Sequence, residues 1–202
     1  MSPVILYALS IQFVGVAVYA QRIYFLMMDE AKTENVLGAL ALALTDAMLR
    51  GAQGEAPEPG PAAAAIVLLG HAPGMPIERL RRALHLSHPG AVRLVDRLVA
   101  DGLVVRRPTL EDRRAVALHL TDAGERGRVA ILGARRQSLA RALKSMDPLE
   151  REMLGRLTEK LLAGLVQDLD HGYAVCRLCD HEVCMDCPVD GALQESASRN
   201  GP

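Results

Sequence analysis

The stretch MPIERLRRALHLSHPGAVRLVDRLVADGLVVRRPTLEDRRAVALHLTDAG, residues 75–124, decides the fold. Apolar residues recur in its first part at the three- and four-residue spacing of an amphipathic helix. We therefore predict a short helix over Met75–Leu84, followed by a turn of the chain at His85–Leu86. The apolar face of this helix consists of Ile77, Leu80 and Leu84.

A second helix is predicted to begin directly after this turn. Ser87 can accept a hydrogen bond from a backbone N–H of the first turn, and Pro89 lies where a missing donor costs nothing. Asp101-Gly102 ends the helix. The predicted buried stripe is Val92, Val95, Leu98 and Val99, and the predicted outward side is His88, Gly90, Arg93 and Arg97. Two helices joined by a tight turn, the second with a cationic outer face, are typical of a helix-turn-helix.

The residues after this pair predict a wing. Leu103–Arg106 and Ala115–Leu120 alternate apolar and polar residues, as two short strands do. Between them Arg107–Arg114 forms a hairpin tip that carries three arginines. Thr121–Gly124 then opens a new helix.

This order of elements closely resembles the MarR family of winged-helix transcription regulators. The resemblance is carried by Leu86-Ser87, Val92–Leu98, Gly102–Val104, Arg106–Pro108, Glu111–Arg114 and Leu120–Gly124. It implies a mainly α fold with a small β-wing, a winged helix-turn-helix with N- and C-terminal dimerisation helices. It also implies a homodimer that binds double-stranded DNA and represses transcription by covering a promoter. An unidentified small-molecule effector would control this binding. Activation is the alternative.

Ten residues are candidates for DNA contact. The N-terminal end of the second helix would enter the major groove first, and arginine suits guanine or phosphate. The resemblance implies that Arg113 reaches the minor groove with Asp112 fixing the tip, and Arg114 could exchange roles with Arg113. Alternatively, Arg93 and Arg97 pair with Asp96 or Asp101, Ser87 only caps, and His88 is only exposed. The full set is Ser87, His88, Pro89, Gly90, Arg93, Arg97, Arg107, Asp112, Arg113 and Arg114.

The charge of the chain is polarised. The net charge of the 202 residues is −1, which by itself gives no sign of nucleic-acid binding. Between Arg79 and Arg114, however, nine arginines face four acids, a local charge of +5 that leaves −6 for the remainder. Such a distribution suits a DNA reader whose other part makes protein contacts.

Residues 1–28 form an apolar N-terminal segment with three interpretations. The run from Pro3 to Ala20 is long enough to be considered as a membrane span, but no Lys or Arg precedes it as in a signal peptide. It is a membrane helix, an additional dimer-packing helix, or sequence translated upstream of a start at Met27 or Met28. We expect a cytoplasmic protein without a membrane partner.

The remaining chain divides into four further parts. Residues 29–61 hold an N-terminal dimerisation helix, over Asn35–Arg50, and a Gly- and Pro-rich loop. Residues 62–124 are the winged helix-turn-helix, with Ala62–Gly70 as a buried apolar helix. Residues 125–172 hold the C-terminal dimerisation helices, and 173–202 are a cysteine-containing tail. The apolar face predicted for the helix Glu125–Lys144 is Val129, Leu132, Leu139 and Leu143.

The predicted last helix, capped by Asp147-Pro148, carries an unusually broad apolar stripe. Such breadth exceeds what one intrachain neighbour needs, so a shared dimer interface is preferred to an intrachain core. The stripe consists of Leu149, Met153, Leu157, Leu161, Leu165 and Leu169.

The tail contains all four cysteines, in the spacing C-x2-C-x4-C-x2-C. Two such pairs can each hold a metal through a tight turn, and four thiolates suit zinc or an Fe–S cluster. A redox switch, a disulfide pair and free thiols are the alternatives; stable disulfides are uncommon in a reducing cytosol. The candidate ligands are Cys176, Cys179, Cys184 and Cys187.

No catalytic motif is present: the sequence lacks a nucleophile elbow, a phosphate-binding loop and HExxH. We therefore predict a regulator rather than an enzyme. Two other classes remain as alternatives, a thiol–disulfide redox protein that uses the Cys-x-x-Cys pairs and a membrane-tethered interaction module based on residues 1–28.

Overall fold

The computed structural model describes residues 29–51, 61–108 and 116–199, and the predictions made for residues 1–28 lie outside them. The chain divides into two compact units, residues 1–46 and 47–202. Residues 29–51 are helical throughout, which includes the helix predicted over Asn35–Arg50. The large apolar residues exposed in the described part of the first unit are Val36, Leu37, Leu40 and Leu42.

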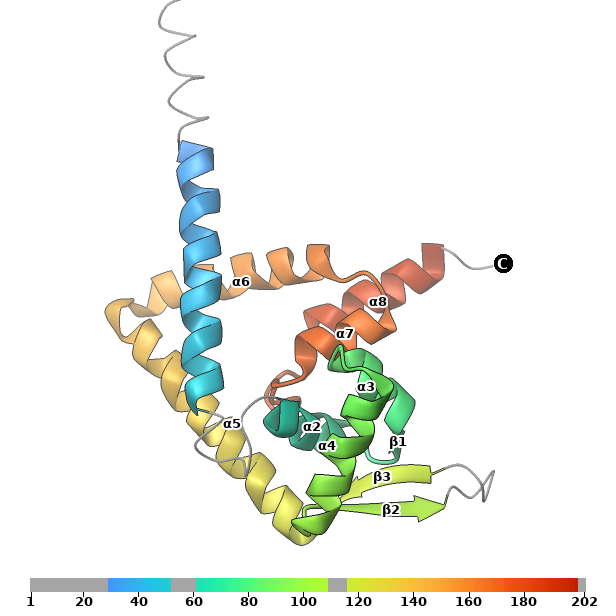
Figure 1. The fold of residues 1–202 in the computed structure, drawn as a ribbon. Helices are drawn as coiled ribbons and strands as arrows, with labels where there is room; N and C mark the ends of the chain where they lie inside the picture. The colour runs from blue at the N-terminus through green and yellow to red at the C-terminus, as the bar shows by residue number, and fades with distance from the viewer. Residues whose placement is uncertain (1–28, 52–60, 109–115, 200–202) are drawn as a thin grey trace, which may run out of the picture. The chain divides into compact units, whose positions relative to one another are not determined.

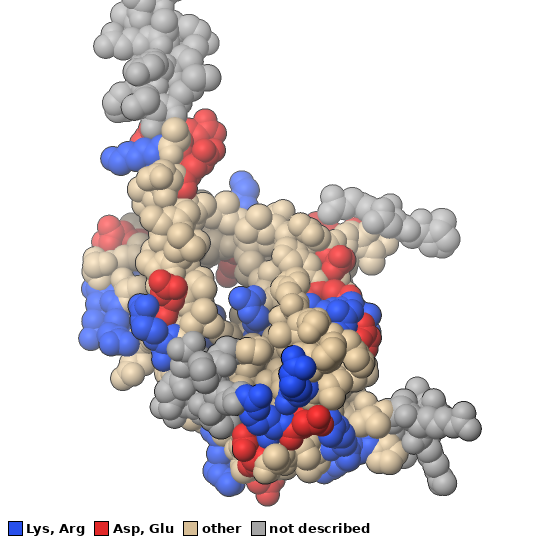
Figure 2. All heavy atoms as spheres, viewed as in Figure 1, with Lys and Arg blue, Asp and Glu red and all other residues tan. Residues whose placement is uncertain are grey.

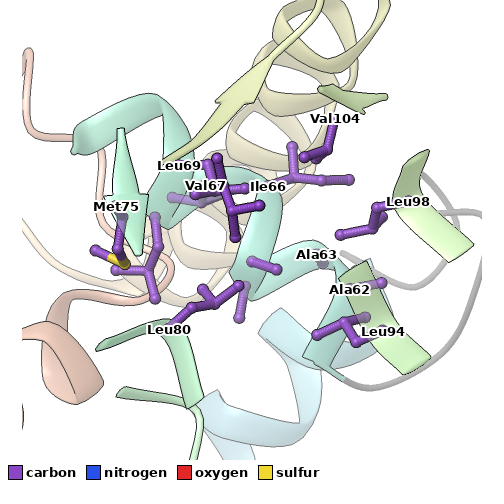
Figure 3. Close-up of a cluster of buried hydrophobic side chains, with 14 of the residues drawn as sticks. Ala62, Ala63, Ile66, Val67, Leu69, Met75, Leu80, Leu94, Leu98 and Val104 are labelled. Atoms are coloured by element: carbon purple, nitrogen blue, oxygen red, sulfur yellow. The ribbon is translucent and has the colours of Figure 1, made fainter. Parts of the chain in front are cut away.

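The second unit is built around helix α2, Pro61–His71. Every residue from Ala62 to Leu69 is buried, so this helix is enclosed on all sides, as its apolar composition predicts. Figure 1 shows α5 on one side of α2 and helices α3 and α4 on the other. The side chains in Figure 3 converge on α2 from α3 (Leu80), α4 (Leu94 and Leu98) and the strands (Met75 and Val104).

The helix-turn-helix is present, but its first helix is shorter than predicted. Helix α3 spans Ile77–Ala83, and Met75–Pro76 is instead a strand, β1. The prediction of a helix from Met75 was wrong because Pro76 has no N–H and extended backbone, with ψ at 150°. Met75 in this strand is buried.

The sheet has three antiparallel strands in the order β1-β3-β2, where a two-stranded wing was expected. Strand β2 is Val104–Pro108 and β3 is Val116–Leu120. Their register places Val104 opposite Leu120 and Pro108 opposite Val116, so the wing is a hairpin whose tip lies outside the described residues. Strand β1 adds to the other edge of β3 through Met75 and Leu118.

Helix α4, the second of the pair, spans His88–Ala100 and ends before Asp101-Gly102, as predicted. Gly102 has a φ of 69°, a left-handed conformation that glycine adopts without strain. The buried stripe differs from the prediction: it is Ala91, Leu94, Val95 and Leu98, whereas Val92 and Val99 lie at its margins. The stripe is rotated because Leu94 belongs to the buried cluster around α2.

Helix α5, Asp122–Ala142, leads away from the wing and ends in a short 3₁₀ turn, Leu143–Ser145. Its buried residues include Ile131 and Leu132. The inclusion of Val129 in the apolar face was wrong, because 64% of that residue is exposed. Leu132 is buried as predicted.

The C-terminal part contains three helices rather than one long one. Helix α6, Pro148–Leu165, begins with the capping box of Asp147 and Glu150. The chain becomes extended at Val166, and α7 then runs from Leu169 to Cys176 and α8 from Pro188 to Arg199. No helix among the described residues is long and apolar enough to cross a membrane.

The leucine stripe is not part of the core of this chain. Helix α6 has no buried residue. The intrachain interpretation of the stripe is therefore wrong for the single chain. Its members are exposed: Leu149 62%, Met153 49%, Leu157 57%, Leu161 50%, Leu165 66% and Leu169 50%.

Two glycines of α5 provide a matched test of this packing. A Cβ atom on Gly124 would lie 2.2 Å from the backbone oxygen of Leu103, whereas one on Gly127 would meet nothing within 4 Å. We expect Gly124→Ala to destabilise the fold by about 1–3 kcal/mol, because backbone must move. Gly127→Ala should stabilise it by up to about 1 kcal/mol. Urea unfolding at one fixed protein concentration measures both, and equal effects would contradict the close approach of α5 to Leu103.

Candidate nucleic-acid interface

The N-terminal end of α4 is fixed by the turn that precedes it. His85 adopts a φ of 51°, and the Arg81 Nη1 donates to the carbonyl oxygen of Leu86 over 3.2 Å. The Ser87 Oγ then accepts a hydrogen bond of 3.2 Å from the Gly90 N–H, which confirms the predicted cap. The first turn of α4 is thereby presented in one direction.

The side chains predicted to face outward do so. His88, Pro89, Arg93 and Arg97 are exposed, and Gly90 is half-buried beside Ser87. Asp96 forms an ion pair of 2.7 Å with Arg106 of β2. This pair links α4 to strand β2 of the wing.

Several arginines of the positively charged segment act within the protein, which the charge count did not anticipate. Arg81 and Arg82 both pair with Glu78, at 2.6 and 3.6 Å, and Glu78 precedes the counted segment. Hydrogen bonding from Arg81 lowers the pKa of the Glu78 carboxyl. The local charge of +5 therefore overstates what solvent meets. Figure 2 accordingly shows basic and acidic spheres intermixed over the region where Figure 1 labels α4 and the wing.

The wing is only partly described. Arg107 is exposed near the end of β2, in agreement with its candidate role. Asp112, Arg113 and Arg114 lie outside the described residues, so their roles stay predictions from the sequence.

The region from α2 to the wing is similar to a family of known proteins. A family model described as MarR family matches residues 59–115, which run from the start of α2 to the wing. Over these residues the chain is similar to the MarR family. The match includes the capped turn and the exposed face of α4 described above.

Individual known proteins are also similar to this chain. The transcriptional repressor MprA of Escherichia coli K12 is 32% identical over 85 residues, which are 42% of this chain and 48% of MprA. The chain thus spans about half the length of this curated relative. A MarR family protein from Bacillus stearothermophilus has 25% identity and a TM-score of 0.60, covering 67% of this chain and 94% of that one. RV1404 from Mycobacterium tuberculosis has 28% identity and a TM-score of 0.56, covering 66% and 92%.

The four cysteines lie beyond the matched MarR residues. Cys176 ends α7, the Cys179 N–H donates to the Cys176 carbonyl oxygen over 2.8 Å, and Cys187 directly precedes α8. All four are free thiols, with Cys184 exposed and the others half-buried. Among the described residues, no three Cys, His, Asp or Glu side chains are already arranged to hold a metal ion.

The thiols nevertheless influence one another. A hydrogen bond with the Cys176 thiol, together with the positive charges of Arg135 and Arg177, lowers the pKa of Cys179 to about 6. The same hydrogen bond, with burial, raises the pKa of Cys176. Burial and the neighbouring Cys187 raise the pKa of Cys184. The Cys176 and Cys179 thiols, taken as a pair, therefore lose their first proton readily and their second proton with difficulty.

The contribution of the Ser87 cap to the stability of α4 can be tested by substitution. Ser87→Ala should lower the free energy of unfolding by about 1 kcal/mol, because the Gly90 N–H loses its acceptor. Ser87→Asp keeps an acceptor at the same position and should retain the stability. Urea unfolding at fixed protein concentration measures the difference, and no loss in Ser87→Ala would show that the observed hydrogen bond does not stabilise α4.

Proposed function

We propose that this protein is a cytoplasmic transcription regulator that binds a specific double-stranded DNA sequence as a homodimer. In this proposal α4 enters the major groove, with its N-terminal turn first, and the wing follows the adjacent backbone. Binding covers a promoter and represses it. A small-molecule effector, whose chemistry the sequence does not specify, changes the spacing of the two α4 helices.

The exposed face of α4 is the observation that carries the proposal. Arg93 and Arg97 lie one turn apart on it, so both side chains can follow one groove. Arginine can donate two hydrogen bonds to guanine O6 and N7 or bind a phosphate. The opposite face of α4 is committed to the core, so the orientation of the helix relative to DNA is set by packing and not by the arginines themselves.

The DNA-binding proposal predicts the effect of Arg97→Ala. A sequence retained by the wild-type protein is first selected from random duplexes, and affinities are then measured by titration at one salt concentration. Arg97→Ala should weaken binding by about 1–3 kcal/mol if the side chain reads a base, with relaxed specificity at one position. If it binds phosphate, affinity should fall about equally for all sequences and the salt dependence should decrease.

Arg141→Ala is the matched control, because it removes the same charge from the exposed last turn of α5. It should leave affinity and salt dependence unchanged. Arg93→Ala extends the test to the neighbouring turn of α4. Unaltered affinity in both α4 variants, with intact folding, would contradict the proposal that α4 binds in the major groove.

The homodimer proposal depends on α6. Five apolar residues of this helix are about half or more exposed on the single chain, a large apolar patch for a helix in water. A second copy of α6 offers a surface of the same chemistry, and two-fold pairing is the commonest arrangement of homo-oligomers. Two α4 helices related in this way would read half-sites about 34–36 Å apart.

We expect the double substitution Leu157→Glu, Leu161→Glu to give a monomer whose fold is unchanged, because both side chains are exposed on the single chain. Sedimentation measures the mass, and circular dichroism checks the helices. The control is Arg156→Glu with Glu152→Arg, which reverses an exposed ion pair of 3.2 Å on the same helix without adding net charge. A wild-type protein that is already monomeric at micromolar concentration would contradict the dimer.

A further inference from the structure

The cysteine-containing tail is held at both ends by the core. Leu178, between the first two cysteines, is 8% exposed, and Val189, just after the last one, is 2% exposed. Between these anchors Met185 is 92% exposed, and Cys184 is exposed beside it. The segment from Cys176 to Cys187 is therefore a short loop with fixed ends and a solvent-exposed centre.

This loop and the helix before it connect to both sides of the winged helix-turn-helix. On one side, Asp170 of α7 pairs with Arg82 of α3 over 2.8 Å, and Arg79 lies 5.8 Å over the ring of Tyr173. Figure 1 shows α7 beside α3 accordingly. The tail is thus attached to the first helix of the DNA-reading pair.

On the other side, the residues between the two cysteine pairs contact α5 and the end of α2. Asp180 pairs with Arg136 over 3.1 Å, and Glu182 pairs with Arg128 over 3.2 Å. The ring of His181 meets that of His71 edge to face, with centroids 4.6 Å apart. All three residues between Cys179 and Val183 are therefore engaged with the domain, which leaves the thiols as the unassigned groups of the loop.

The surroundings favour negatively charged sulfur. Arg135 of α5 lines the same cavity as Cys179, and the buried Nε of Arg135 has no hydrogen-bond partner among the described residues. A cavity of about 370 Å³ between α5 and the loop is lined by Arg135, Arg136, Cys179 and Cys184. Cys187 lies at the N-terminal end of α8, where the helix dipole favours an anion.

We propose that Cys176, Cys179, Cys184 and Cys187 bind one zinc ion as a tetrahedral four-thiolate site. Each thiol that binds releases its proton to solvent, and the resulting charge of −2 on the site is offset by the nearby arginines. Soft thiolate ligands in a set of four, with no His or carboxylate needed, select zinc over harder cations. Both Cys-x-x-Cys pairs are already turned, and binding requires the exposed Cys184 pair to close onto the half-buried first pair.

The zinc ion would act as a clip. It would join the end of α7, which rests on α3, to the start of α8 through a loop that rests on α5. Removing it would leave the loop between the buried anchors Leu178 and Val189 held by the His181–His71 ring contact and by two ion pairs. Exposed ion pairs stabilise by at most about 1 kcal/mol each. This consequence concerns the tail alone and does not depend on the proposed DNA-binding function.

The test is metal analysis of the full-length protein purified without added metal under anaerobic conditions. We expect about one zinc per chain, which follows from a single four-thiolate site. Replacement by Co²⁺ should give the visible absorption of a tetrahedral thiolate complex. Cys179→Ser/Cys184→Ser, which removes one ligand from each pair, should lose the zinc and the cobalt spectrum.

Met185→Ser is the matched control, because it changes an exposed residue of the same loop that is not a thiolate. It should retain one zinc per chain. Since a four-thiolate site also fails if the double variant does not fold, circular dichroism and hydrogen exchange over α2 to α5 must stay at wild-type level in that variant. Iron with acid-labile sulfide, two disulfides without metal, or four free thiols without metal would each overturn the proposal.

Discussion

Burial of α2 on all its sides is the constraint on which the second unit depends. Four consecutive alanines at its start let neighbouring helices approach closely, and the larger Ile66, Val67, Leu68 and Leu69 then fill the space between α3, α4, α5 and the sheet. A helix enclosed in this way leaves its neighbours little freedom, because protein interiors are close-packed. The C-terminal end of α2 is also closely packed, because a Cβ on Gly70 would lie 2.1 Å from Cδ of Arg128.

This packing explains how one helix can be rigid and exposed together. Leu94, Val95 and Leu98 fix one face of α4 to the core, while the capped turn at Ser87 fixes its first residues. The Arg106–Asp96 pair adds a connection from β2. Because none of these contacts uses Arg93 or Arg97, those two side chains can be changed without disturbing the features that orient the helix. That separation of packing face and outer face is what a DNA reader requires.

The sequence was sufficient for features that depend on neighbouring residues. The caps at Ser87, Thr121 and Asp147, the helix stop at Gly102 and the continuous apolar run of α2 are local signals, and the structure has all of them. Helical periodicity also identified helices α3 to α6, although it left the ends of α3 and α6 in error. Local patterns were therefore sufficient to predict helix α4 and its exposed residues.

The errors concern contacts between distant parts of the chain. Pro76 is a local reason why no helix begins at Met75, but no local pattern reveals that Met75–Pro76 pairs with β3, more than forty residues later. Leu94 replaced Val92 in the buried stripe because the position of α2, not the spacing within α4, determines which face is covered. Similarly, the pairing of Arg82 with Asp170 spans most of the fold, so a count of charges along the sequence could not find it.

Similar long-range contacts connect the exposed helix α6, through α7, to the helix-turn-helix formed by α3 and α4. The chain passes from α6 to α7 through Val166–Asp168, and Asp168 caps α7 by accepting from the His171 N–H over 2.8 Å. Helix α7 then rests on α3 through Asp170 and Tyr173. A displacement of α6 along its own axis would therefore act on the extended backbone at Val166, on the Arg82–Asp170 pair and on α8, which packs against α6. Bending at three exposed or half-buried residues costs less than separating packed helices, so we expect the Val166–Asp168 link to bend before α7 leaves α3.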